Sequence, residues 1–249
     1  MDILFTKTLN DNQKQELSHL ISCCEADEPS RLLFSLSDDE GSYFLGREGN
    51  NLIAALALYP TGDILECTAA VIPERRRQGF FQSLLSLAEK YFPERDFHFL
   101  TDGNSPTALA VLSKLGCTLL CKELLMRLNL EDLSPSSLQQ KICSPDLFIQ
   151  QTFDKDSLFF HAFLGSSPIG TCSVFLSGKQ ACIWGMEIKQ PFLGQGFGTS
   201  LLFQVLFQLS SLHTLSFISL HVDSENLPAV SLYQKAGFQV EECIYYYLY

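Results

Sequence analysis

Apolar and polar positions follow two rhythms along this chain, one typical of strands and one typical of helices. Short alternating or almost wholly apolar runs predict strands, and apolar positions three and four apart predict helices. The first half is expected to fold in the order strand, helix, three strands, helix, strand, helix, strand. The expected strands cover residues 3–9, 42–48, 51–60, 64–73, 97–102 and 119–128, and the expected helices cover 11–26, 79–91 and 106–115.

The second half repeats this order with similar spacing. Strands are expected at 147–153, 158–165, 169–178, 180–189, 217–223 and 239–249, and helices at 196–209 and 228–236. Gly79 and Gly196 open matching helices 117 residues apart, and Gly116 and Gly237 end the later helices 121 residues apart. A shared element order with shared glycines indicates an internal duplication. The second copy has no counterpart to the helix at 11–26.

A polar stretch divides the two copies near the middle of the chain. Residues 129–145 hold two prolines and four serines, which is typical of a linker. We therefore expect a first domain at 1–130, a linker at 131–145 and a second domain at 146–249. The fold class is α/β of the mixed α+β kind, with two tandem domains that each have a central mixed sheet flanked by helices.

The composition narrows the function classes. The chain has 249 residues, 46% of them apolar, and a net charge of −11, which argues against nucleic acid or an anionic membrane as the main partner. The start shows no signal-peptide pattern, and no apolar run approaches the length of a membrane helix. Nine cysteines without a CxxC pair indicate reduced, mostly buried thiols in a cytoplasmic protein. The histidines are scattered, so no metal site is expected.

The stretch "LGQGFGTS" follows an expected strand and opens an expected helix. Successive N–H groups at a helix N-terminus favour a phosphate, and glycine lets the phosphate come close to the backbone. The alternative is a tight glycine-rich turn without a ligand. The glycine pattern alone does not choose between these two interpretations.

A second motif adds to the first. "NLPAVSLYQKAGF" has the order N-x-x-A-x-x-L-Y-x-K-x-G-F from Asn226 to Phe238. A strand, a glycine loop that opens a helix, a further strand and this motif together resemble the GNAT superfamily of N-acetyltransferases. The resemblance is specific over residues 181–249 and weaker in the first half, so the chain resembles a tandem GNAT protein whose two sheets are splayed.

The resemblance implies an acetyl-CoA co-substrate and a place for each part of it. The pantetheine would lie beside the strand that ends near Ile188, and Tyr233 would protonate the thiolate leaving group. Asn226 would be a helix cap, a cofactor contact or both. The pyrophosphate would lie on the backbone of Gly194, Gln195, Gly196, Phe197, Gly198 and Thr199.

The general base is a separate question. Glu187 is our candidate, because it faces away from Ile188 on an alternating strand, either into the acceptor cleft or into solvent. A water-relayed base at Asp223 or Glu225 is a second possibility. A third is that the acceptor amine has a low pKa and needs no base.

The two copies depart from the family pattern in different ways. The second copy has Leu193 where the family usually has Arg or Gln. The first copy keeps Arg76 and Gly79, but Phe81 replaces the small last residue of the loop. Leu112, which cannot donate a proton, stands at the tyrosine position. We therefore predict catalysis in the second copy. The basic turn that contains Arg76 and Arg77 either holds a diphosphate or is a solvated turn.

Three functions follow from these observations. The first is an acetyl-CoA-dependent N-acetyltransferase that acts on a primary amine of a small molecule or peptide. The second is a non-catalytic acyl-CoA-binding or partner-binding pseudoenzyme of the same fold. The third, an aminoacyltransferase that uses charged tRNA, is disfavoured by the acidic charge. The last segment, "CIYYYLY", is expected to pair as an edge strand, either between the subunits of a homodimer or between the two copies.

Overall fold

A computed structural model describes residues 2–28, 30–31, 34–36, 41–133, 138–139, 141, 146–212 and 214–249. The chain divides into two compact units. Unit 1 comprises Met1–Lys122 together with Cys243–Tyr249, and unit 2 comprises Glu123–Glu242. Most of the linker expected at 131–145 lies outside the described residues.

Unit 1 contains every element expected in the first copy. Its strands are β1 (Asp2–Thr6), β2 (Ser42–Glu48), β3 (Asn51–Thr61), β4 (Ile64–Val71) and β5 (Phe97–Thr101), with parts of β6 (Thr118–Asn129) and β12 (Gln239–Leu248). Its helices are α1 (Asp11–Asp27), α2 (Phe80–Tyr91) and α3 (Pro106–Leu115).

Unit 2 repeats this order except for the first strand and helix. Its strands are β7 (Leu147–Asp154), β8 (Ser157–Leu164), β9 (Ser167–Ser177), β10 (Gln180–Ile188) and β11 (Phe217–Asp223), with the remaining parts of β6 and β12. Its helices are α5 (Phe197–Ser210) and α6 (Leu227–Ala236).

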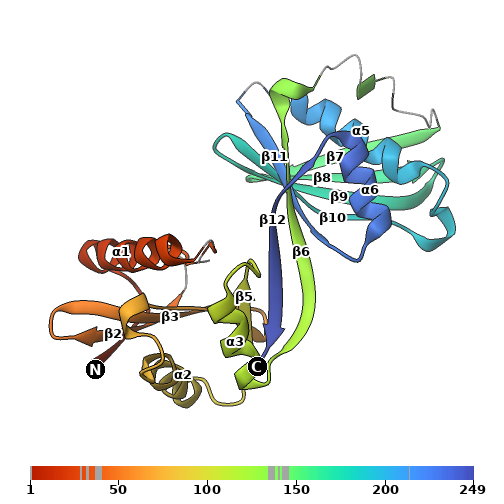
Figure 1. Cartoon of the computed structure of the whole chain (residues 1–249). Helices are drawn as coiled ribbons and strands as arrows, with labels where there is room; N and C mark the ends of the chain where they lie inside the picture. The colour runs from red at the N-terminus through yellow and green to blue at the C-terminus, as the bar shows by residue number, and fades with distance from the viewer. Residues whose placement is uncertain are drawn as a thin grey trace. The chain divides into compact units, whose positions relative to one another are not determined.

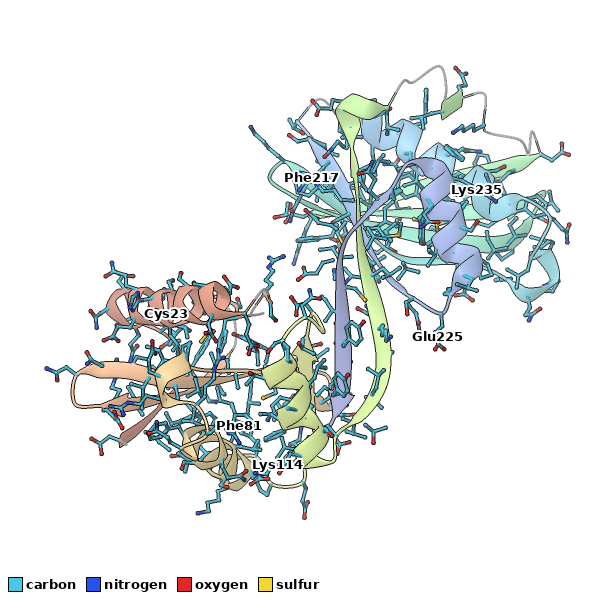
Figure 2. The ribbon with its side chains drawn as sticks, viewed as in Figure 1. Cys23, Phe81, Lys114, Phe217, Glu225 and Lys235 are labelled. Atoms are coloured by element: carbon cyan, nitrogen blue, oxygen red, sulfur yellow. The ribbon has the colours of Figure 1, made fainter. Side chains whose placement is uncertain are left out.

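Helices cover both faces of the sheet in unit 1. Alternate residues of a strand point to opposite faces, so neighbouring apolar positions feed two separate cores. Phe44 and Leu56 pack with α2, whereas Tyr43 and Leu45 pack with α1. Figure 1 shows α1 and α2 on opposite sides of β2 and β3, and Figure 2 shows Cys23 of α1 and Phe81 of α2 on these two sides.

In unit 2 the described helices cover only one face of the sheet. α5 contains seven buried residues and packs on β9 and β10, and α6 contacts β11 (Figure 1). Leu158, Phe160 and Ala162 of β8 point into this core. The other face has no described counterpart to α1, as the sequence predicts.

In each unit two central strands pair over part of their length and then separate. β4 and β5 pair in parallel only over Leu65–Cys67, and β10 and β11 pair in parallel only over Gln180–Ile183. Beyond Cys67, β4 has no further pairing with β5. Beyond Ile183, β10 has no further pairing with β11. The sheets are therefore mixed and splayed, as the resemblance implies.

The last strand of each copy lies in the sheet beside the fifth strand of the other copy. β12 pairs antiparallel with β5, and β6 pairs antiparallel with β11 over the whole of Phe217–Asp223. In the strand order, β12 lies between β5 and β6, and β6 lies between β11 and β12. The last segment therefore pairs with a strand of the other copy, which is one of the two expected alternatives, but it is not an edge strand. The limits of the compact units differ from the expected limits at 130 and 146 because these two strands are exchanged.

Candidate active site

The glycine turn of unit 2 presents free backbone donors. After a 3-10 turn at Gln190–Phe192, Gly194 and Gly196 adopt φ values of +73° and +84°, a region that glycine enters without strain. The first intrahelical bond of α5 runs from Ser200 N–H to the Gly196 carbonyl at 3.1 Å. The N–H groups of Phe197–Thr199 donate no hydrogen bond to any of the described residues. This turn can accept an anion.

Gly198 lies where the helix approaches the splayed part of β10. A Cβ built there would be 3.6 Å from Ile188 Cγ1 and 3.9 Å from Leu232 Cδ2, which are ordinary contacts. A methyl group therefore fits, but a larger side chain has to enter the space between β10 and α6. The two neighbours place the glycine turn directly beside Ile188.

β10 carries a bulge at the point where it leaves β11. Trp184 pairs with Ser173 and Glu187 pairs with Thr171, so Gly185 and Met186 together oppose a single residue of β9. Gly185 has a φ of +58°. The corresponding strand β4 pairs with β3 without such an interruption. Bulges re-aim side chains, and this one turns Met186 towards α6.

Tyr233 meets the bulged strand from α6. Its side chain is 7% exposed, and its hydroxyl donates to Met186 Sδ at 3.8 Å. Burial, with a further contribution from Cys172, raises the pKa of Tyr233 to about 12. The hydroxyl therefore keeps its proton at neutral pH and is already directed at a sulfur atom beside the splay.

Asn226 is a helix cap. Its Oδ1 accepts from Ala229 N–H at 3.3 Å, which satisfies one of the free donors of α6. Asp223 accepts from Glu225 N–H at 2.8 Å and so stabilises the turn before the helix. Glu225 is exposed in this turn (Figure 2). The cap is thus established, whereas the cofactor contact of Asn226 stays a prediction.

Glu187 lies on the face of β10 that points away from α5 and α6. It is exposed and pairs in register with Thr171, and it makes no ion pair or hydrogen bond with the described residues. Tyr233 and Glu187 therefore approach the splayed part of β10 from opposite faces of the sheet.

In unit 1 side chains fill the space that corresponds to the one beside Gly198 in unit 2. Gly79 caps α2 with the same φ of +84° as Gly196, but Phe81 follows at the position of Gly198. The Phe81 ring packs against Phe99 of β5, with ring centroids 6.1 Å apart. Leu112, at the position of Tyr233, is 5% exposed and lies in the same core.

The polar groups of unit 1 are engaged by the end of α1. Arg76 Nη1 lies 2.7 Å from Asp27 Oδ2 and 3.3 Å from Glu28 Oε1. Glu28 also accepts hydrogen bonds from the hydroxyls of Ser105 and Thr107, at the start of α3. Burial opposes its ionisation, but these bonds and the Arg76 charge outweigh that effect and lower the pKa of Glu28. A carboxylate of the chain itself thus pairs with Arg76 of the basic turn.

These contacts of Glu28 could not be predicted from local patterns, because the partners lie 48 to 79 residues away. Trp184 was not among the predicted site residues, although it is 52% exposed on the same strand as Glu187. Two features of the sequence could have identified it. Trp184 is the single tryptophan of the chain, and it stands three residues before the candidate base.

Two classes of feature are absent from the described residues. No helix in that part of the chain is long and apolar enough to cross a membrane. No group of three or more His, Cys, Asp or Glu side chains there is arranged to hold a metal ion. The eight cysteines that the structure describes are free, and three of them are buried.

A splayed mixed sheet with a glycine turn at a helix N-terminus and a buried tyrosine beside it defines the class of CoA-dependent acyltransferases. The family model described as "Acetyltransferase (GNAT) family" matches residues 8–117 and again 125–238. The chain therefore belongs to the GNAT acetyltransferase family, in tandem form. Members of this family use an acyl-CoA co-substrate and acetylate amines.

Solved structures share this fold at low identity. A GCN5-related N-acetyltransferase from Sphaerobacter thermophilus is 14% identical, with a TM-score of 0.76 over 99% of this chain and 95% of that one. A tandem GNAT protein from the clavulanic acid biosynthesis pathway is 15% identical, with a TM-score of 0.66 over 100% and 98%. A GNAT acetyltransferase from Colwellia psychrerythraea is 14% identical, with a TM-score of 0.55 over the full length of both chains. None of the curated proteins matches the sequence.

Proposed function

We propose that unit 2 transfers the acetyl group of acetyl-CoA to a primary amine of a small molecule or peptide. The observation that carries the proposal is the contrast between the two glycine turns. Gly198 leaves the space beside the splay open in unit 2, whereas Phe81 fills the corresponding space of unit 1 and Glu28 pairs with Arg76 of its turn.

The backbone of residues 194–199 would hold the pyrophosphate. Leu193 is 52% exposed and has no charge to offer, so the free N–H groups and the helix dipole of α5 supply the attraction. The pantetheine arm would lie beside Ile188, where β10 has lost its partner strand. Asn226, at the start of α6, would be within reach of the same arm.

Tyr233 would assist the departure of the thiolate. A thiol has a pKa of about 8.5, so complete proton transfer from a hydroxyl of pKa about 12 would be uphill by roughly 5 kcal/mol. The hydroxyl therefore acts by donating a strong hydrogen bond to the sulfur while the C–S bond breaks. A proton from solvent then completes the thiol.

The amine would approach from the opposite face of the sheet. A protonated amine must first lose a proton, and Glu187 is the carboxylate on that face. The neutral nitrogen then attacks the thioester carbon, the C–N bond forms, the C–S bond breaks, and the products are an amide, a CoA thiol and one proton. This arrangement separates the incoming amine from the leaving sulfur.

The test begins with the number of cofactor sites. Titration calorimetry with acetyl-CoA should give one site per chain, and a second site would contradict the closed state of unit 1. Turnover is then measured over a panel of amines by chromatography of released CoA, because the nine cysteines of the chain would react with thiol reagents.

The pseudoenzyme remains the second candidate because Leu193 replaces a residue that would contribute to cofactor binding. It predicts one acetyl-CoA site and no turnover with any amine. A Tyr233→Phe variant separates the two functions, because it lowers turnover only if the protein is an enzyme.

A further inference from the structure

The face of the unit 2 sheet that no described helix covers has an unusual composition. Its positions alternate with the buried core residues Leu158 and Phe160, so their side chains point away from α5 and α6. We call it the uncovered face, and near the bulge it consists of Phe159, His161, Thr171, Ser173, Trp184 and Glu187.

The strand registers identify the counterparts of these residues in unit 1. Tyr43 pairs with Ala57 as Phe159 pairs with Ser173, and Ala55 pairs with Ala70 as Thr171 pairs with Glu187. The same alignment matches Leu45 with His161 and Thr68 with Trp184. In unit 1 all six positions are buried, and five of them belong to the core that α1 covers.

The residue types at these six positions differ between the two copies in chemical character. Small alanines, which let α1 approach the sheet of unit 1, are replaced in unit 2 by Thr171, Ser173 and Glu187. A buried leucine is replaced by a histidine, and a buried threonine by Trp184. A face that had merely lost its helix would need polar residues for solubility. An exposed tryptophan beside a carboxylate is instead the composition of a binding surface.

Trp184 and Phe159 form an aromatic pair on this face. Their ring centroids lie 6.3 Å apart at an interplanar angle of 82°, so the two rings form an edge-to-face pair. Further aromatic side chains extend the surface outwards, with Phe175 on β9 and the Phe148–Phe163 pair on β7 and β8. The aromatic surface therefore spans four adjacent strands.

The charge of this surface suits a cation. Tryptophan binds cations over its ring more strongly than other aromatic side chains, and Glu187 offers a carboxylate without a partner among the described residues. Residues 123–242 hold eleven Asp and Glu against six Lys and Arg. An alkylamine is protonated at neutral pH and so complements both the ring and the carboxylate.

The openness of the surface bears on the size of the ligand. Small molecules bind in concave sites that enclose most of their surface, and Trp184, at 52% exposed, does not line such a site. Four strands span roughly 14 Å, which corresponds to about four residues of extended peptide. A chain that crosses the strands at the level of Trp184 would contact Trp184 on β10 and then Phe159 on β8.

We propose that Trp184, Phe159 and Glu187 form the acceptor subsite, and that its ligand is the protonated side-chain amine of a lysine in an extended peptide. Trp184 and Phe159 determine specificity by holding the cationic side chain. Glu187 attracts the amine and brings it to the splayed end of β10. This inference rests on the proposed function, because it assigns the acceptor of the same reaction.

The single tryptophan provides a direct binding signal. The full chain, loaded with acetyl-CoA or with the non-transferable desulfo-CoA, is titrated with a capped pentapeptide that has a central lysine. The Trp184 emission should change saturably. A matched peptide with norleucine in place of lysine should produce at least a tenfold weaker response, and so should n-butylamine or spermidine.

Variants then test the residues. Trp184→Ala and Glu187→Gln should each raise the KM for the lysine peptide by roughly three- to tenfold, while calorimetry shows an unchanged acetyl-CoA affinity. Trp184→Phe should restore most of the lost affinity, because it keeps an aromatic ring. Asp156→Asn, which removes one exposed charge in the turn between β7 and β8, is the matched control and should leave the KM unchanged.

The outcomes separate this proposal from the one on which it rests. If acetyl-CoA binds but a small amine is acetylated with a higher kcat/KM than the lysine peptide, or Trp184→Ala leaves the KM unchanged, the acceptor assignment is wrong and the acetyltransferase assignment stands. If acetyl-CoA does not bind, the acetyltransferase assignment itself is wrong.

Discussion

Replacing Gly198 with phenylalanine should close the cofactor site of unit 2. The change copies Phe81, which fills the corresponding space of unit 1 against Phe99. A Cβ at position 198 already lies 3.6 Å from Ile188 and 3.9 Å from Leu232, so the ring has to enter the splay. Overpacking of this kind costs about 1 to 3 kcal/mol in the free protein.

Thermal unfolding with and without acetyl-CoA measures the effect. At a ligand concentration of about 100 times Kd, binding stabilises the folded state by roughly 2.7 kcal/mol. For a chain of this length that corresponds to a rise in Tm of about 5 to 10 °C. The wild type should show this rise, and Gly198→Phe should show less than about 1 °C.

Two variants control for general damage. Gly198→Ala adds only the Cβ, whose neighbours lie at ordinary distances, so the free protein should be as stable as the wild type or more stable by up to about 1 kcal/mol. It should keep most of the cofactor-induced rise in Tm. Phe81→Leu alters the corresponding site of unit 1 and should leave that rise unchanged. A full rise in Gly198→Phe, or its loss in Phe81→Leu, would refute the assignment to unit 2.

Three further predictions concern other parts of the chain. Tyr233→Phe should lower kcat by roughly 10- to 100-fold with an unchanged acetyl-CoA Kd. Because the folded pKa of about 12 exceeds the unfolded value of about 10, the wild type should also lose more stability than this variant as the pH rises from 10 to 12. Glu28→Gln should destabilise unit 1 by about 1 to 3 kcal/mol at pH 7. Since the pKa of Glu28 is lowered on folding, that difference should shrink as acid protonates the wild-type carboxyl, which urea titrations at pH 7 and pH 3 would reveal. Deletion of Cys243–Tyr249 should remove hydrogen-exchange protection from β5 but not from β11, because β12 is the antiparallel partner of β5, whereas β11 pairs with β6. Equal loss in both strands would contradict the observed pairing.

Local patterns were sufficient to predict nearly every element of the fold. The helix expected at 11–26 is α1 at Asp11–Asp27, and the helix expected from Gly79 begins at Phe80 with Gly79 as its cap. Periodicity and capping act within a few residues, so a single sequence reveals them. The exchange of β6 and β12 was not resolved, because both strands are apolar and follow similar helices. Nothing local distinguishes the two sheets that each could join.

The candidate site was predictable to the extent that it depends on a motif. The glycine turn lies at the start of α5, Asn226 at the start of α6 and Tyr233 beside the splay, whereas their roles towards a cofactor stay predictions. The closure of unit 1 could not be predicted, because it depends on Glu28 meeting Arg76 and Ser105 across the fold. Arg76 of the basic turn that the sequence left undecided is thus already paired with carboxylates of the chain itself.

The exchanged strands also determine when each half can finish folding during synthesis. The first 122 residues leave the ribosome early, yet β5 receives its neighbour only when the last seven residues of the chain emerge. Until then β5 presents an unpaired edge, which is a site for wrong pairing with other chains. In the second half, by contrast, β11 can pair as soon as it is synthesised, because β6 precedes it in the chain. Loss of Cys243–Tyr249 would therefore damage the half that was translated first.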